Sequence, residues 1–404
     1  MKSAYVILRR SGNPTRDFLQ APSPMHSGSN ETFAMTAEVL DVSQSFSVDV
    51  DELSRRDLTT LSRDGQVVAA APVMPMKLIK PFDAAAPDGS NVPGIEWGVR
   101  AVAAHSSPFD GKGVIVAVLD TGIDKTHPAF AGVTLVEKDF TGGGNGDVNG
   151  HGTHCAGTIF GRDVDGRRIG IARGVTNALI GKVLGAGGGS SDQIVQAIQW
   201  AVNEGANVIS MSLGIDFPGA VKQWEIQLPT ELAVSRALEG YRANVLLFER
   251  LASMVRMQSM MRQATIIVAA AGNESRRDDD SKFVIAVAPP AVAEGIFSVA
   301  ALGQSATGLK VAPFSNTGAN LAGPGVAINS AKVGGGLRTL SGTSMSTPHV
   351  AGVAALWAQK LKTLNMLKES VLATRLAGSG NFDGFDSGVD PADVGTGLVR
   401  APQS

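Results

Sequence analysis

Three polar side chains in short stretches rich in small residues could together carry out nucleophilic catalysis. Asp120 ends the apolar run VAVLD, His151 lies in NGHGTHCAGT, and Ser344 lies in SGTSMSTPHVAG, directly before a run of helical period. A serine hydroxyl becomes a good nucleophile when an imidazole takes its proton, and the imidazole needs a buried carboxylate to fix its tautomer. The three residues predict an Asp-His-Ser triad, with Ser344 at a helix start and Pro348 in the first turn.

A fourth stretch, AAAGNE, offers a group that could stabilise negative charge. The Asn273 amide follows an apolar strand-like run and the Ser344 backbone N–H lies at a helix start, so both are suitable donors to a tetrahedral oxyanion. Each stretch alone is weak, because an aspartate after a strand is commonly a helix cap and HGTH could be half of a metal site. Four such stretches in one chain indicate acyl-transfer chemistry.

The elements that must position these residues follow from apolar runs that alternate with helical patterns after about Gly113. A helical stripe occupies SSDQIVQAIQWAVNEG, and such alternation predicts an α/β fold with a parallel, doubly wound sheet and helices on both faces. Sheets of this kind place their chemistry at the carboxyl ends of the strands, where Asp120, Gly214 and Asn273 fall. The predicted strands are 113–120, 178–184, 206–214 and 264–273.

One segment, from Pro229 to Gln263, departs from this alternation. It predicts one long helix or a helical pair, with Thr230 as N-cap. The apolar stripe of this helix comprises Val234, Leu238, Tyr241, Val245, Phe248, Ala252 and Val255. The methionines that follow are interpreted as core gap-fillers rather than a partner surface; they are Met254, Met257, Met260 and Met261.

The first 80 residues predict a separate, small α+β unit. AYVILRR, TFAMTAEVLDV, FSVDVDEL and QVVAAAPV alternate as strands do, and SRRDLTTLSRDG reads as a helix with Ser54 and Asp57 in capping-box spacing. KPFDAAAPDGSNVPG is typical of an exposed linker. We therefore divide the chain into residues 1–79, a linker at 80–94, and a large domain at 95–404 with a helical insertion at about 217–263.

Composition excludes several classes of protein. The net charge of −2 over 404 residues gives no reason to expect nucleic acid or an anionic membrane as partner. The single cysteine, Cys155, excludes an intramolecular disulfide. The chain has no signal-peptide core and no apolar run of membrane-spanning length, so as written it is expected to be cytoplasmic, or secreted if a signal has been removed.

The stretches DTGID, HGTHCAGT, AAAGNE and GTSMSTPHVAG, in the order Asp, His, Ser, closely resemble the subtilases, the subtilisin-like serine peptidases. The resemblance extends from about Ile95 to the C-terminus. It implies that Asp120 orients the imidazole, His151 is the general base and then acid, Ser344 is the nucleophile and Asn273 is an oxyanion donor. It also implies that the chemistry requires no cofactor.

The same resemblance implies a polypeptide substrate held as an added antiparallel strand. Two segments would hold it, Gly187-Gly188-Gly189 and Ser212-Leu213-Gly214, beside Ala271, Gly272 and Glu274. Glu274 either attracts a basic side chain or is merely solvated. The N-terminal unit resembles the family's ferredoxin-like inhibitory prosegment, which acts as an intramolecular inhibitor, so we expect self-cleavage between Pro75 and Pro93.

The sequence departs from the family pattern at two places. Ala129 stands where calcium-binding subtilases usually have an aspartate ligand, so no metal is assigned, although a structural calcium stays open. The helical insertion permits a dedicated maturation protease whose arm selects one partner. A non-catalytic peptide-binding protein is the third hypothesis, and the presence of all four catalytic residue types argues against it.

Overall fold

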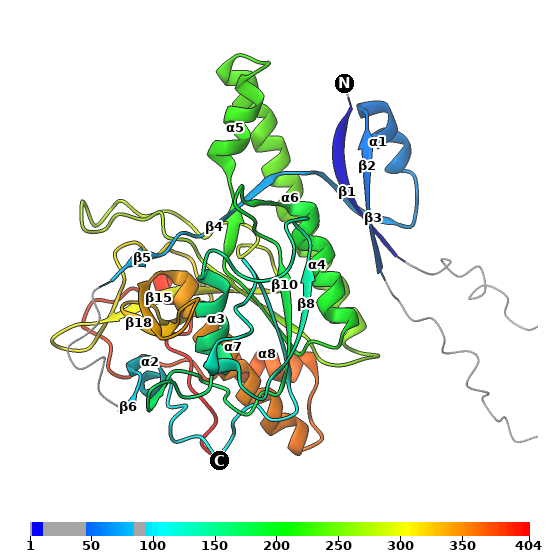
Figure 1. Cartoon of the computed structure of the whole chain (residues 1–404). Helices are drawn as coiled ribbons and strands as arrows, with labels where there is room; N and C mark the ends of the chain where they lie inside the picture. Colours follow the sequence, from blue (N-terminus) through cyan, green and yellow to red (C-terminus); the bar gives the residue numbers. More distant parts are fainter. Residues whose placement is uncertain (1, 11–45, 85–93) are drawn as a thin grey trace, which may run out of the picture.

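A mostly parallel sheet forms the centre of the molecule (Figure 1). The computed structural model describes residues 2–10, 46–84 and 94–404. Within them the sheet has eight strands in the order β16-β15-β14-β12-β7-β10-β8, with β17 also paired to β15. Only β16 pairs antiparallel to its neighbour. The strands are β7 (Ile115–Asp120), β8 (Thr134–Asp139), β10 (Asn177–Lys182), β12 (Val208–Met211), β14 (Ile266–Ala270), β15 (Ile296–Gln304), β16 (Leu309–Val311) and β17 (Leu321–Pro324).

Helices cover this sheet in two packed pairs. Helix α3 (His151–Phe160) packs against α7 (Thr343–Thr363), and α4 (Ser191–Asn203) packs against α6 (Thr230–Gln258). The central strands β12 and β14 are buried along their whole length, as expected when both faces of a sheet are covered. The predicted doubly wound α/β fold is confirmed.

The N-terminal unit is a small antiparallel sheet that packs on α4 and α6. Its strands β1 (Ser3–Arg10), β2 (Phe46–Leu53) and β3 (Val67–Pro72) lie in the order β2-β1-β3. The predicted capping box is present at α1 (Arg55–Leu61). The predicted strand TFAMTAEVLDV lies outside the described residues.

From this unit an extended segment, residues 72–84, which we name the strap, crosses the large domain (Figure 1). Its strand β4 (Pro75–Leu78) lies between β11 (Gly189–Ser190) and β13 (Leu213–Ile215), antiparallel to both. The strap then forms β5 (Phe82–Asp83), which pairs with β19 (Leu337–Ser341). Segments that are far apart in the sequence thus hold the strap over the sheet.

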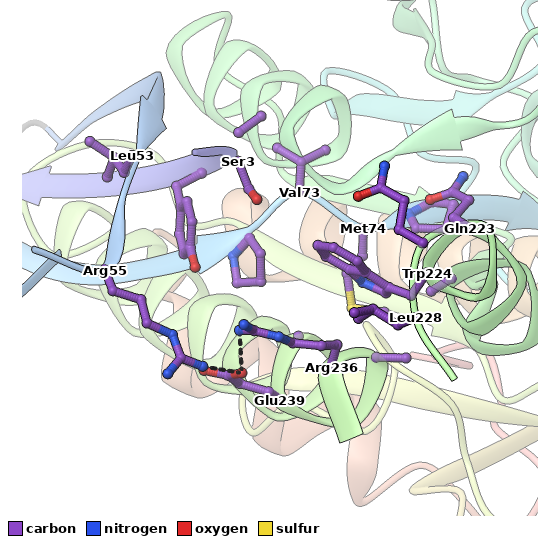
Figure 2. A pocket seen from close by; sticks show the side chains of 18 of the residues that line it. Ser3, Leu53, Arg55, Val73, Met74, Gln223, Trp224, Leu228, Arg236 and Glu239 are labelled. Carbon is purple, nitrogen blue, oxygen red and sulfur yellow. Dashed lines mark hydrogen bonds and ion pairs between the residues drawn. The ribbon is translucent and has the colours of Figure 1, made fainter. Parts of the chain in front are cut away.

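The helical insertion forms an arm, residues 217–244, made of α5 (Phe217–Glu225) and the first half of α6. Its two helices are linked by an edge-to-face contact of Phe217 with Tyr241, with centroids 5.9 Å apart. The long helix is confirmed, although its N-cap is Pro229 rather than Thr230. The sequence did not resolve α5 as a separate helix. Figure 2 shows Trp224 and Leu228 of the arm beside Met74 of the strap.

The predicted apolar stripe of α6 is wrong in the arm and correct beyond it. Val234 and Leu238 are 39% and 49% exposed, whereas Phe248 and Val255 are buried. The methionine interpretation is likewise only partly right: Met254 is buried, but Met260 and Met261 are 85% and 61% exposed.

The remaining described elements are short. These elements are β6 (Gly94–Ile95), α2 (Trp97–Ala101), a 3₁₀ turn (Pro128–Phe130), β9 (Arg167–Arg168), β18 (Ile328–Ala331), α8 (Glu369–Ala377) and α9 (Pro391–Val394).

No helix of residues 2–10, 46–84 and 94–404 is long and apolar enough to cross a membrane. The cytoplasmic location stays a prediction.

Candidate active site

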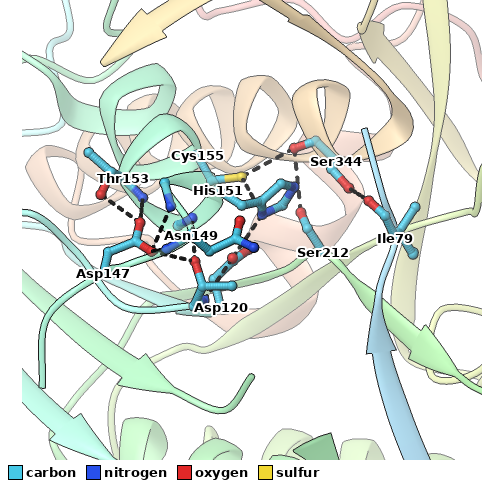
Figure 3. Close-up of polar contacts among 12 residues, drawn as sticks. Ile79, Asp120, Asp147, Asn149, His151, Thr153, Cys155, Ser212 and Ser344 are labelled. Atoms are coloured by element: carbon cyan, nitrogen blue, oxygen red, sulfur yellow. Dashed lines mark hydrogen bonds and ion pairs between the residues drawn. The ribbon is translucent and has the colours of Figure 1, made fainter. Parts of the chain in front are cut away.

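The end of β7 and the start of α3 bring Asp120 and His151 together (Figure 3). The His151 Nδ1–H donates to Asp120 Oδ1 at 2.8 Å, and both residues are buried. Asp120 Oδ1 also accepts from the Thr121 backbone N–H at 2.8 Å. Helix α3 can come this close because position 152 is glycine: a Cβ there would lie 2.2 Å from the Gly122 carbonyl oxygen. The carboxylate therefore fixes both the ring position and its tautomer.

Two side chains that the sequence analysis missed hold the start of α3. Thr121 Oγ1 accepts from the Gly152 N–H at 2.9 Å and donates to Asp147 at 2.9 Å. Asp147 in turn accepts from the Thr153 N–H at 2.9 Å and from its hydroxyl at 2.7 Å. These bonds satisfy backbone donors that a helix start leaves free. The only signal in the sequence is an acidic residue shortly before the helix.

The charge state of His151 depends on two opposing effects. Burial lowers the pKa of the imidazole, but the Asp120 carboxylate beside it raises the pKa well above the usual 6.5. Burial also raises the pKa of the Cys155 thiol, so the cysteine is neutral and Asp120 is the dominant charged partner. A neutral ring, the form that can accept a proton, is therefore favoured by alkaline pH.

Ser344 is fully buried beneath the strap, in the first turn of α7. Its hydroxyl donates to the Ile79 carbonyl oxygen at 2.9 Å (Figure 3). The His151 Nε2, which would receive the serine proton, has no hydrogen-bond partner among the described residues. The hydrogen bond between Asp120 and His151 is thus formed, but the Ser344 hydroxyl donates to the strap and not to the imidazole.

Pro348 lies inside α7, because the helix begins at Thr343, and not in the first turn as the sequence predicted. A proline has no N–H for the carbonyl four residues earlier, which here belongs to Ser344. That carbonyl instead lies 3.4 Å from the Cys155 thiol and 3.4 Å from the Ser212 hydroxyl, which both donate to it. The proline therefore frees a carbonyl that ties α7 to α3 and to the segment before β13.

Asn273 joins the strap to the start of α7. Its Nδ2 donates to the Lys80 carbonyl at 3.1 Å, while its Oδ1 accepts from the Thr343 N–H at 2.9 Å and hydroxyl at 2.8 Å. The side-chain oxygen is thereby fixed and the amide donor is directed toward the strap. The predicted donor therefore lies beside Ser344, on the carbonyl one residue beyond Ile79.

The turn that carries Asn273 is shaped by Asn316, a buried residue that the sequence analysis missed. Its Nδ2 donates to the Ala271 carbonyl at 3.1 Å and to the Glu274 carboxylate at 2.8 Å. Gly272 has a φ of +115°, and a Cβ there would lie 2.2 Å from Asn316 Nδ2. Among the described residues Ala271, Gly272 and Glu274 form no hydrogen bond with the strap. Nothing local in the sequence marks Asn316.

The two predicted substrate-binding segments do flank an extended chain, and that chain is the strap. Met76 pairs with Gly189, Lys77 with Gly214, and Leu78 with Leu213. The Ile79 N–H donates to the Ser212 carbonyl at 3.4 Å. Gly188 leaves room for the strap, since a Cβ there would lie 2.6 Å from the Met76 carbonyl oxygen, whereas in the described residues Gly187 has no hydrogen bond to the strap.

The residues around Ala129, where an aspartate ligand of calcium was expected from the family resemblance, lack suitable ligands for a calcium ion. Ala129 is buried and its side chain offers no oxygen ligand. The neighbouring backbone carbonyls are taken by a cation of the chain itself. The Arg162 guanidinium donates to the carbonyls of Phe160 at 3.0 Å and Val175 at 2.9 Å, and also to that of Arg173. These residues do not fit a calcium ion.

One group of potential metal ligands occurs among the described residues. It consists of Asp120, His151 and Cys155, whose ligand atoms lie within 4.8 Å of one another. The His151 Nδ1 in this group already donates to Asp120, and the buried thiol is protonated. The group is therefore better described as a hydrogen-bonded cluster than as a metal site.

Comparison with known proteins agrees with this fold and geometry. The model of the subtilase family, peptidase S8, matches residues 111–386, more than half of the chain. The chain therefore belongs to the subtilase family of serine peptidases, which hydrolyse peptide bonds. Family members need no cofactor for catalysis, and their substrates are polypeptides.

Individual relatives are similar over most of the chain. The M-protease of Shouchella clausii is 34% identical over 312 residues, which cover 75% of this chain and 70% of the relative. Subtilisin Savinase of Lederbergia lenta is 34% identical over 304 residues, covering 71% and 96%. Alkaline elastase YaB of a Bacillus species is 34% identical over 323 residues, covering 75% and 70%.

Proposed function

We propose that this chain is a serine endopeptidase made as a self-inhibited zymogen, with Asp120, His151 and Ser344 as its triad and Asn273 as an oxyanion donor. The observation that carries the proposal is the contact of 2.9 Å between the Ser344 hydroxyl and the carbonyl of Ile79, in a strap paired as an added strand. The Asp-His hydrogen bond supports the role of the imidazole as base.

The proposed chemistry begins with a rotation of the Ser344 hydroxyl toward His151 Nε2. The oxygen attacks the carbonyl carbon as its proton passes to Nε2, and Asp120 stabilises the imidazolium that forms. Negative charge on the carbonyl oxygen is stabilised by the Asn273 amide and the Ser344 backbone N–H. His151 then gives the proton to the departing amine, and water hydrolyses the acyl-enzyme by the same steps.

We assign self-cleavage to the bond between Ile79 and Lys80. The Ile79 carbonyl receives the serine hydroxyl, and the Ile79 N–H is aligned by the Ser212 carbonyl. Asn273 lies on the next carbonyl, that of Lys80, so the reaction requires its amide to move to the Ile79 oxygen. Residues 1–79 are then the inhibitory prosegment, and the large domain that remains begins with the linker at 80–94.

The test is to follow processing of the full chain together with active-site labelling. We expect wild type to yield a new N-terminus with the sequence KPFD and to react with a fluorophosphonate at Ser344. Ser344→Ala should remain uncut, while Ser346→Ala, a matched change on the same helix, should be cut like wild type. Cleavage of purified Ser344→Ala at the same bond would overturn the triad.

A second candidate is a protease dedicated to the maturation of one partner. It is favoured by one observation. The arm contacts the strap at Pro72, before β4 and outside the two segments that flank β4. The non-catalytic hypothesis has no such support.

A further inference from the structure

The strap is bound by the arm well before it reaches Ser344. The Pro72 carbonyl accepts from Asn244 Nδ2 at 2.8 Å. Asn244 is fully buried in α6, its Nδ2 otherwise bonds only to the Gly240 carbonyl, and its Oδ1 has no partner within the described residues. A buried amide costs free energy unless it is hydrogen-bonded, so this side chain depends on an extended chain beside it.

Between Asn244 and β4, the strap is bound through its backbone. The Met74 N–H donates to the Ser191 hydroxyl at 3.0 Å, and the Met74 carbonyl accepts from the Ser191 N–H at 2.9 Å. The Pro75 carbonyl accepts from the Asp216 N–H at 2.9 Å. Ser191 is fully buried at the start of α4. Contacts of this kind do not require a particular side chain on the bound segment.

The surface of the arm has room for different side chains at this place. Gly240 lets the strap approach, since a Cβ there would lie 3.0 Å from Met74 Sδ. A cavity of about 760 Å³ adjoins Met74 and is lined by Tyr5, Trp224 and Leu228 among others (Figure 2). Because Tyr5 belongs to the N-terminal unit, release of that unit would open the cavity further.

We infer that the groove between the arm and the start of α4 is an extended subsite for polypeptide substrates, which binds their backbone six to eight residues before the bond that is cut. Counting back from Ile79, Met74 is the sixth residue and Pro72 the eighth. This inference rests on the proposed function. The substrate class is a long, extended polypeptide chain, and Asn244 and Ser191 are the residues of the subsite that bind its backbone.

The test uses enzyme matured from the full chain and two internally quenched peptides. The short peptide carries residues 76–83, MKLIKPFD, and the long one residues 72–83, PVMPMKLIKPFD. We expect about tenfold lower KM for the long peptide with similar kcat, because a few hydrogen bonds far from the reaction contribute to binding in the ground and transition states alike.

Two perturbations address the contacts separately. Asn244→Ala removes the bond to Pro72, and a long peptide methylated on the Met74 nitrogen removes the bond to Ser191 in unaltered enzyme. Each should raise the KM of the long peptide toward that of the short one. Asn244→Ala should leave kcat/KM for the short peptide unchanged. Arg242→Ala, an exposed residue of the same helix, is the matched control and should change nothing.

The outcomes separate this inference from the proposed function. Equal KM values for both peptides in wild type, or an advantage retained under both perturbations, would overturn the subsite. If the Asn244 variant does not fold, the methylated peptide decides the question alone. Failure to cut either peptide, together with no labelling of Ser344, would instead reject the peptidase proposal on which the subsite depends.

Discussion

The two halves of α6 bury faces of opposite character. In the arm, the buried face consists of small or polar residues, and the large apolar side chains Val234 and Leu238 point to solvent. Beyond Asn244 the buried face is large and apolar, with Phe248 and Leu251 packed into the core. The core half is thus bound by side-chain packing, and the arm half accommodates a neighbouring backbone. The buried residues of the arm half are Ala233, Ala237, Gly240 and Asn244.

The largest effect expected from this contrast is on stability. Phe248→Ala should lower the free energy of unfolding by about 3–5 kcal/mol, because it leaves a cavity in the core, whereas Leu238→Ala should change it by less than about 0.5 kcal/mol. Denaturant unfolding of both variants in a Ser344→Ala background, which prevents self-digestion, measures the difference. Equal losses would mean that the arm packs like the core.

Acid is expected to act on the core and not on the arm, which has no histidine. Burial lowers the pKa of His154, to about 3, and that of His349, to about 4. The unfolded chain binds these protons near pH 6.5, so stability is complete above that pH and is lost as the pH falls toward 4. Each histidine should contribute a slope of about 1.4 kcal/mol per pH unit.

The measurement is unfolding free energy against pH from 7 to 4.5, again in the Ser344→Ala background. His349→Gln should remove part of the slope, while a change at the exposed His105 should leave it intact. A wild-type curve that is flat between pH 6.5 and 4.5 would contradict the assignment of two buried neutral imidazoles.

The same contrast explains what the sequence could predict. Parallel strands bring their carboxyl ends to one edge, so Asp120 and Asn273 could be placed near each other from local patterns alone. Asp147 and Asn316 could not. Asp147 bonds to a backbone group at a helix start and Asn316 to one in a turn, and neither residue carries a periodic signal. The hydrophobic period identified the core half of α6 but gave the wrong face in the arm, where the bound partner is a backbone.

Two side chains that bind backbone carbonyls, Arg162 shortly after α3 and Asn244 in the arm, should contribute differently to stability. Arg162 donates hydrogen bonds to three carbonyls of the large domain whether or not the strap is docked, whereas Asn244 has its Pro72 partner only while the strap is docked. Arg162→Leu should cost about 2–3 kcal/mol of stability, since it leaves buried carbonyls unpaired.

A chelator should leave the wild-type melting temperature unchanged; a large decrease would indicate a bound calcium ion.

The smallest effect, and the most specific to the arm, is expected from Gly240→Ala. Alanine favours a helix by up to about 1 kcal/mol over glycine, so the isolated large domain should gain slight stability. The new Cβ would lie 3.0 Å from Met74 Sδ and 3.4 Å from Pro72 Cγ, so the docked strap must shift by a few tenths of an ångström. The change should therefore strengthen the helix while it loosens the strap.

After cleavage, residues 1–79 should leave the variant severalfold faster than wild type, measured as recovery of activity on the short peptide. Ser235→Ala, on the exposed face of the same helix, is the control and should release the prosegment at the wild-type rate. An unchanged release rate in Gly240→Ala would show that the arm does not bind the strap closely, and the two halves of α6 would then differ in composition but not in role.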